Sequence, residues 1–285
     1  MATNNFIPEI WSARILDYLR KELVYSELFN TDYEGDITEM GDTVHIGMVG
    51  DVTIKSFDCD QDIDAAEDVK ANDTTLKIDQ GDYFNISVCD VNAAQSAVNL
   101  LEGATEKAGY GFSDNTDKYL GNLLATKAGI TVGKGTKSAP TAITADNAYE
   151  TMVNIKTALD KANLPKKGRK VVVPPEFEGF MLLDPRFVQV GTDASNDRFE
   201  EGTVYKVAGL EVRVSNNAPT FTYETSKTGY EIVASSPVQG TFANQILKTE
   251  AYRPEKRFAD AVKGLHVYGA AVLRPEVVAV AHVSF

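Results

Sequence analysis

The stretch FANQILKTEAYRPEKRFADAVKGLHVYGAAVLRPEVVAVAHV, residues 242–283, is the part of this chain that decides its fold. A charged turn at residues 253–257 interrupts the stretch, and an apolar-periodic segment follows the turn. Pro275 then precedes an apolar run at residues 277–283, which predicts a strand. Because the stretch contains no nucleophile-and-base signature, it indicates a structural role rather than catalysis.

The composition of the whole chain is that of a globular protein. Its 285 residues are 43% hydrophobic, which is enough for one large or two medium domains. No run is apolar enough to span a membrane, and the first residues lack the pattern of a secretory signal. Cys59 and Cys89 do not make a disulfide framework, so we expect reduced thiols. The net charge of −13 disfavours tight nucleic-acid binding, but it does not prevent a container from enclosing DNA.

The first 90 residues predict an arm and a ribbon. Ile15, Leu19 and Leu23 recur at four-residue spacing, so residues 1–34 read as an arm with a short helix. Two runs with a period of two follow, which predicts two long strands joined by an acidic tip at residues 58–75. The apolar positions of the runs are Val44, Ile46, Met48, Val52 and Ile54, then Leu76, Ile78, Phe84, Ile86 and Val88. An isolated ribbon is marginal in water, so it must lie on its own core or on another subunit.

The remaining residues alternate between helix and strand signals. Residues 92–128 are mostly helical, with glycines in the middle and a possible restart at Ser113. A Gly-, Lys- and Ser-rich linker is expected at residues 129–140. Thr144 is the expected cap of a helix through residues 148–162, and a strand at residues 171–173 ends at a proline pair whose second proline starts another helix. A hairpin is expected around Gly209.

Several sequence blocks occur in the order of one family. The blocks are FIPEIWS at residues 6–12, Leu164-Pro165, Gly168-Arg169, residues 171–175, the hairpin with Gly209, Val212 and Ser215-Asn216, and residues 242–275. Together they resemble the major capsid proteins of tailed bacteriophages, which have the Hong Kong 97 fold. The resemblance covers nearly the whole chain.

This resemblance implies an α+β capsid fold with five parts. They are an N-terminal arm at 1–34, a peripheral (P) domain with the long spine helix at 35–46 and 89–139, an extended β-ribbon (E-loop) at 47–88, an axial (A) domain at 140–240, and the rest of the P domain at 241–274, with a return strand at 275–285. The implied function is self-assembly into hexamers and pentamers of an icosahedral head that encloses double-stranded DNA. The implied location is the virion, assembled in the host cytoplasm, with a separate scaffolding protein and a portal as partners. No catalytic residue, cofactor, metal or membrane contact is implied.

Candidate site residues are therefore those of subunit interfaces. Aromatic residues dominate interface energetics, which favours the anchors Trp11, Tyr18, Phe57, Tyr83 and Phe84. The charged turn of the P domain is expected to set register through intersubunit ion pairs. Its candidate residues are Arg253, Glu255, Lys256 and Arg257.

The sequence patterns for phosphate or metal binding are incomplete. Residues 129–135 have the wrong spacing for a phosphate loop, and the alternate aspartates from Asp58 to Asp64 lack the turn glycine of a calcium loop. His45, His266 and His282 lack metal-ligand spacing. The lysines at residues 166–170 read as a solvated turn. Three alternatives stay open: an encapsulin-type compartment with the same fold, a tail-tube or decoration protein, and a soluble enzyme whose site is assembled from distant residues.

Overall fold

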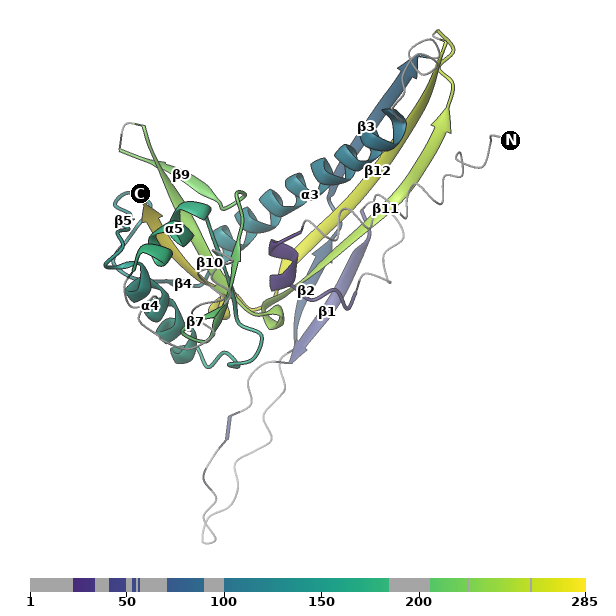
Figure 1. The fold of residues 1–285 in the computed structure, drawn as a ribbon. Coiled ribbons are helices and arrows are strands. Elements are labelled where there is room, and N and C mark those ends of the chain that lie inside the picture. The colour runs from purple at the N-terminus through teal and green to yellow at the C-terminus, as the bar shows by residue number, and fades with distance from the viewer. Residues whose placement is uncertain are drawn as a thin grey trace, which may run out of the picture.

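The computed structural model describes residues 23–33, 41–49, 53–54, 56, 71–89, 100–184, 206–224, 226–256 and 258–285. These residues form two sheets and a ribbon, with one long helix against both sheets (Figure 1). We call the eight-stranded sheet the wide sheet and the three-stranded sheet the long sheet. Separate helices and mostly antiparallel strands confirm the predicted α+β class.

The wide sheet has the strand order β4-β13-β10-β6-β8-β7, with β5 beside β13 and β9 beside β10. Its strands are β4 (Ile130–Thr131), β5 (Thr141–Ala142), β6 (Lys170–Val173), β7 (Lys206–Val207), β8 (Leu210–Val214), β9 (Thr220–Tyr223), β10 (Lys227–Ser235) and β13 (Ala279–Ser284). Side chains alternate between its faces. Along β10, Ile232 and Ala234 join one buried cluster and Val233 joins the other. The chain therefore covers both faces of this sheet.

Helices α4 (Ala148–Lys161) and α5 (Pro175–Leu183) cover one face of the wide sheet. The predicted apolar stripe of α4 is confirmed, because Met152, Ile155 and Leu159 are fully buried. The predicted Thr144 cap is wrong. The N-cap is Asn147, whose side-chain oxygen accepts a hydrogen bond from the Thr144 backbone N–H. The helix after the proline pair begins at the predicted proline.

The long sheet has the order β11-β12-β3, all antiparallel. Its strands are β11 (Gly240–Tyr252), β12 (Ala259–Val272) and β3 (Gln80–Cys89). Apart from the passage through α3, the described chain crosses between the two sheets through η3 (Pro237–Gln239) and through η4 (Pro275–Val277). The crossings lie side by side, because the backbone N–H groups of Leu273 and Arg274 both donate to the Gln239 carbonyl oxygen, at 2.8 and 2.9 Å.

Helix α3 (Leu100–Lys127) lies along one face of the long sheet and reaches the wide sheet (Figure 1). A column of rings joins the helix to the long sheet, with neighbouring centroids 5.0–5.7 Å apart: Phe84, Phe112, His266, Tyr268 and Tyr119. The expected restart at Ser113 is wrong. The Ser113 hydroxyl donates to the Gly109 carbonyl within one continuous helix. Tertiary packing outweighs the helix-breaking tendency of the glycines.

The ribbon differs from its prediction. Strand β1 (Thr43–Val49) pairs with β2 (Ala71–Lys77) and not with the run that contains Phe84, Ile86 and Val88. That run is β3, an edge strand of the long sheet. Alternating patterns identify strands but not their partners, and so the pairing could not be read from the sequence.

The base of the ribbon packs on the long sheet. Ile46, Leu76 and Ile78 are buried there with Val267 of β12. A Cβ atom at Gly269 would collide with the Lys77 carbonyl oxygen, so the close approach requires a glycine on β12.

The stretch 129–140, expected as a linker, begins with strand β4 of the wide sheet, and residues 133–140 form the loop that follows it. Strand β4 runs parallel to β13, and the Val132 N–H donates to the Val280 carbonyl. A Cβ at Gly129 would lie 2.6 Å from the Pro275 carbonyl oxygen, so this glycine permits close backbone packing.

Candidate functional site

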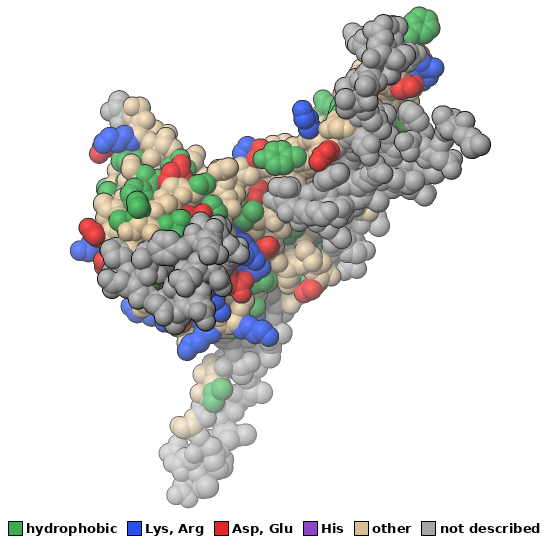
Figure 2. Space-filling model, in the orientation of Figure 1, with side chains coloured by type: hydrophobic (Ala, Val, Ile, Leu, Met, Phe, Trp, Pro, Cys, Tyr) green, Lys and Arg blue, Asp and Glu red, His purple; other side chains and the backbone are tan. Residues whose placement is uncertain are grey.

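The long sheet presents large apolar side chains to solvent, one near the middle of its edge strand β3, opposite Leu265, and one at its far end. Tyr83 of β3 is 80% exposed, and Phe258, in the turn between β11 and β12, is 86% exposed. Figure 2 shows hydrophobic, basic and acidic side chains together at this tip. Exposed aromatic residues with charged neighbours are typical of protein–protein contact sites.

The register of the strands places a set of polar groups on the same face as Tyr83, away from α3. Tyr83 lies opposite Leu265, and Asn85 lies opposite Lys263. The Tyr252 hydroxyl donates to the Asn85 side-chain oxygen at 3.0 Å. This face is therefore a strip in which an aromatic residue stands beside a preformed polar pair.

Ion pairs hold the charged side chains of this tip in place. The Lys263 ammonium lies 2.8 Å from Glu250 and 5.5 Å from the centre of the Tyr252 ring. The hydrogen bond and charge of Glu250 raise the pKa of Lys263. Arg253 pairs with Asp260 at 3.3 Å. These exposed pairs contribute little stability, but they orient the groups that a partner would meet.

The predicted interface residues differ in their exposure and in their partners within the subunit. Tyr83 is exposed, whereas the half-buried Phe84 points to the other face and packs on Phe112. Arg253 has its ion pair within the same subunit. Glu255 and Lys256 are exposed, with no ion pair to a described residue. The other candidates lie outside the described residues: Trp11, Tyr18, Phe57 and Arg257.

Sequence reasoning missed Phe258 as a contact residue. Its signal was a large aromatic side chain directly after a charged turn, where solvent exposure is expected. Ile54 was assigned to a strand face, yet it is 94% exposed. Neither residue belongs to a buried cluster of the described chain.

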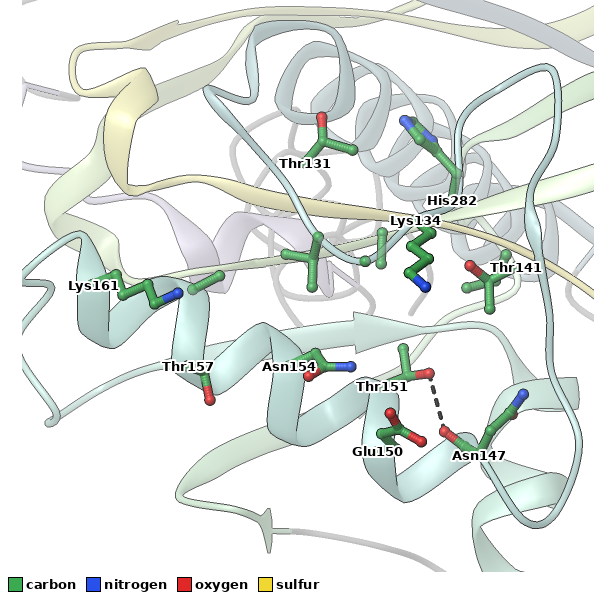
Figure 3. A pocket seen from close by; sticks show the side chains of 15 residues that line it. Thr131, Lys134, Thr141, Asn147, Glu150, Thr151, Asn154, Thr157, Lys161 and His282 are labelled. Atoms are coloured by element: carbon green, nitrogen blue, oxygen red, sulfur yellow. Dashed lines mark hydrogen bonds between the residues drawn. The ribbon is translucent and has the colours of Figure 1, made fainter.

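A cavity of about 540 Å³ lies between α4, β13 and residues 131–134 (Figure 3). Its lining mixes polar and apolar side chains, with Lys134 on the loop side and Asn154 and Thr151 on α4. The Thr151 hydroxyl donates to the Asn147 carbonyl oxygen, as the dashed line in Figure 3 shows. The Thr157 hydroxyl donates to a backbone carbonyl in the same way. These hydroxyls are bonded to the helix backbone, so neither is paired with a base that could activate it.

The histidines have structural positions. His266 is fully buried between Phe112 and Tyr268. His282 is buried beside Glu231, with 3.2 Å from Nδ1 to the carboxylate. Burial lowers the pKa of His282, although the charge of Glu231 acts in the opposite direction. In the part of the chain that is described, no three His, Cys, Asp or Glu residues cluster as metal ligands would, and Asp58–Asp64 lie outside that part.

None of the described helices has both the length and the apolar character that crossing a membrane requires.

Comparison with known proteins identifies the family. The family model described as phage capsid protein matches residues 68–281. Comparison with curated protein sequences gives no match. A solved chain of Mycobacterium phage Che8 is 27% identical, with a TM-score of 0.74, and the alignment covers 98% of each chain.

More distant structures share the fold. A chain from the capsid structure of the cyanophage P-SCSP1u is 16% identical with a TM-score of 0.70, covering 92% of this chain and 88% of that one. A chain from a virus-like particle of Pyrococcus furiosus is 12% identical with a TM-score of 0.57, covering 98% and 100%. The family match spans most of the chain. This chain belongs to the phage capsid protein family.

Proposed function

We propose that copies of this capsid protein assemble as hexamers and pentamers into an icosahedral head that encloses double-stranded DNA. The observation that carries the proposal is the exposed apolar surface of the long sheet, where Tyr83 on the edge strand and Phe258 at the far end have no cover from the described part of their own subunit. A surface of this kind is stable when a second copy covers it, and repeated use of one such surface closes a shell.

The parts of the subunit take the following roles in this proposal. The wide sheet corresponds to the A domain, the long sheet with α3 to the P domain and its spine helix, and the ribbon β1–β2 to the E-loop. The likeness to the phage Che8 chain over nearly the full length supports this assignment. The net charge of −13 on each subunit disfavours adhesion of the enclosed DNA to the protein, since like charges repel.

The protein acts as a structural component and not as an enzyme in this proposal. The virion is its location after assembly in the host cytoplasm, with a separate scaffolding protein and a portal as partners. The family match and the cavity hydroxyls that are bonded to the α4 backbone support this role.

The test is expression of the protein alone and with its candidate scaffolding partner, followed by size-exclusion chromatography and electron microscopy. Closed icosahedral particles are expected. Tubes would favour a tail-tube protein, and a discrete monomer under both conditions would contradict the proposal. Replacement of Trp11 by alanine should lower the particle yield while the wide sheet stays folded.

A compartment that stores an enzyme is the second candidate, because the virus-like particle from Pyrococcus furiosus has the same fold. The genomic neighbours separate the two. Portal and terminase genes beside this gene support the phage head, whereas a cargo enzyme would support the compartment. Nuclease-resistant DNA inside particles purified from the host would also favour the head.

A further inference from the structure

One short segment contacts both sheets and the long helix. We call residues 23–30 the strap; it contains the single turn η1 (Tyr25–Leu28). Its apolar side chains are buried where the two sheets and α3 meet, and they belong to the cluster under the wide sheet. These side chains are Leu23, Tyr25, Leu28 and Phe29. The apolar side of the strap is therefore buried in the junction, while Glu27 stays partly exposed.

Helix α3 holds the start of the strap. Asp117 is 1% exposed, and its carboxylate accepts hydrogen bonds from the Val24 and Tyr25 backbone N–H groups, each at 3.0 Å. These two N–H groups stand at the start of the η1 turn, where the turn itself offers them no carbonyl acceptor. Gly121, one turn further along α3, leaves room for Tyr25, because a Cβ there would lie 3.2 Å from the tyrosine ring. Helix α3 therefore both binds the backbone of the strap, through Asp117, and makes room for its Tyr25 side chain, through Gly121.

The wide sheet holds the middle of the strap through one carboxylate. Glu27 Oε2 accepts from the Lys170 ammonium at 2.7 Å and from the Arg213 Nε at 2.8 Å. Lys170 starts β6 and Arg213 lies on the neighbouring strand β8. Burial would raise the pKa of Glu27, but the two cationic partners outweigh it and hold the pKa below its usual value. The carboxylate is thus a charged bridge to two strands.

The first residues of β11, in the long sheet, bind the end of the strap. The Asn30 N–H donates to the Gly240 carbonyl at 3.0 Å, and the Phe242 N–H donates to the Asn30 carbonyl at 2.9 Å. The Gln239 side chain donates to the Leu28 carbonyl at 2.9 Å. Gln239 and Gly240 are the residues at which the chain passes from one sheet to the other. The strap is therefore fastened at the crossing itself.

We infer that the strap, through Glu27, fixes the angle between the wide sheet and the long sheet and so sets the curvature and diameter of the shell. The inference rests on the proposed function. The strap touches both sheets within a few residues, so a change of angle must break either its Glu27 contacts or its Asn30 contacts. Because interfaces repeat around a closed shell, a small change of angle in each subunit becomes a change in the size of the particle. Glu27 acts as a positioning residue.

The test is the diameter distribution of particles made by Glu27→Ala, measured by cryo-electron microscopy. Glu27 is partly exposed, so its removal should leave the subunit folded, with an unchanged far-ultraviolet circular dichroism spectrum. We expect the single diameter of wild-type particles to be lost in favour of a broad distribution. The double variant K170Q/R213Q breaks the same contact from the other side and should give the same distribution. The triple variant should add no further broadening.

Glu150→Ala is the matched control, because this glutamate lies on α4, away from the strap, and should leave the diameter unchanged. Glu27→Ala particles with the wild-type diameter would overturn the inference and leave the proposed function intact. Failure of the wild-type protein to form shells would instead contradict the proposed function. If Glu27→Ala does not fold, Glu27→Gln keeps the side-chain size and removes the charge, and its diameter distribution decides the matter.

Discussion

The wide sheet is covered on both faces by its own chain, whereas the long sheet leaves Tyr83 of its edge strand and Phe258 at its far end exposed to solvent. This difference indicates separate roles, in which the wide sheet contributes subunit stability and the exposed side chains of the long sheet contribute association. The comparison predicts that mutations in the wide sheet change folding, and that mutations of the exposed side chains of the long sheet change assembly.

The largest effect is expected in the core of the wide sheet. Phe177 of α5 is fully buried, so Phe177→Ala should lower the free energy of unfolding of the unassembled subunit by about 3–5 kcal/mol. Urea unfolding followed by fluorescence measures this loss. The exposed Leu183 of the same helix is the control, and Leu183→Ala should change stability by less than about 0.5 kcal/mol. Similar losses for both variants would contradict the assignment of the core.

The next effect is a dependence of the unfolding free energy on pH, caused by His266 between α3 and the long sheet. Burial lowers the pKa of His266 to about 4, with Asp82 acting in the opposite direction, and neither ring nitrogen has a hydrogen-bond partner among the described residues. Because the unfolded histidine has its usual pKa of 6.5, the unfolded chain binds the proton first. Stability is therefore complete above pH 6.5 and decreases by about 3 kcal/mol as the pH falls toward 4.

His266→Leu removes this dependence, since an apolar side chain suits the site between Phe112 and Tyr268. The measurement is the difference between the wild-type and variant unfolding free energies at each pH. Burial raises the pKa of Asp117 to about 6, which acts with the opposite sign, but Asp117 is present in both proteins and cancels in the difference. A difference that does not vary between pH 7 and pH 4 would show that His266 is not the titrating group.

An intermediate effect is expected on the exposed edge strand of the long sheet, and it concerns assembly alone. Tyr83→Ala should leave the unfolding free energy of the subunit unchanged within about 0.5 kcal/mol. It should raise the protein concentration required for assembly about tenfold, or ~1.4 kcal/mol per subunit. Light scattering across a concentration series measures this threshold. Tyr110 is an exposed tyrosine on α3, and an equal shift for Tyr110→Ala would remove the special status of the Tyr83 face.

The smallest effect is expected where the strap meets α3. Alanine normally stabilises a helix relative to glycine, but a Cβ at Gly121 would lie 3.2 Å from both the Tyr25 ring and Pro219. Because Tyr25 is fully buried and cannot move away, Gly121→Ala should destabilise the subunit by about 1 kcal/mol. Gly111 has no atom near its Cβ position, and Gly111→Ala should stabilise by about 0.5–1 kcal/mol. Thermal unfolding of both variants should show shifts of opposite sign.

The sequence was sufficient where a pattern is local. The stripe of Met152, Ile155 and Leu159, the proline that begins α5 and the turn at Gly209 each depend on neighbours within a few residues, and the structure confirms them. The overall fold was predicted from the order of the sequence blocks that resemble the capsid family. Periodicity alone does not specify how the helices and strands are arranged in space.

The sequence was insufficient where a contact joins distant residues. Glu27 meets Lys170 across 143 positions and Arg213 across 186, and no local spacing marks such a pair. Strand partners have the same difficulty, since β3 could have paired with the ribbon on pattern alone. The exposure of Tyr83 and the burial of Phe84 follow from which face α3 covers, and this is a property of the folded chain.

The carbonyl of Gln239, which accepts from both Leu273 and Arg274, joins the crossings at η3 and η4 to each other. The helix α3 and the strap contact both sheets beside these crossings. A force applied at the outer end of the long sheet is therefore shared among several connections before it reaches the wide sheet, and no single peptide segment at the junction has to bear it alone.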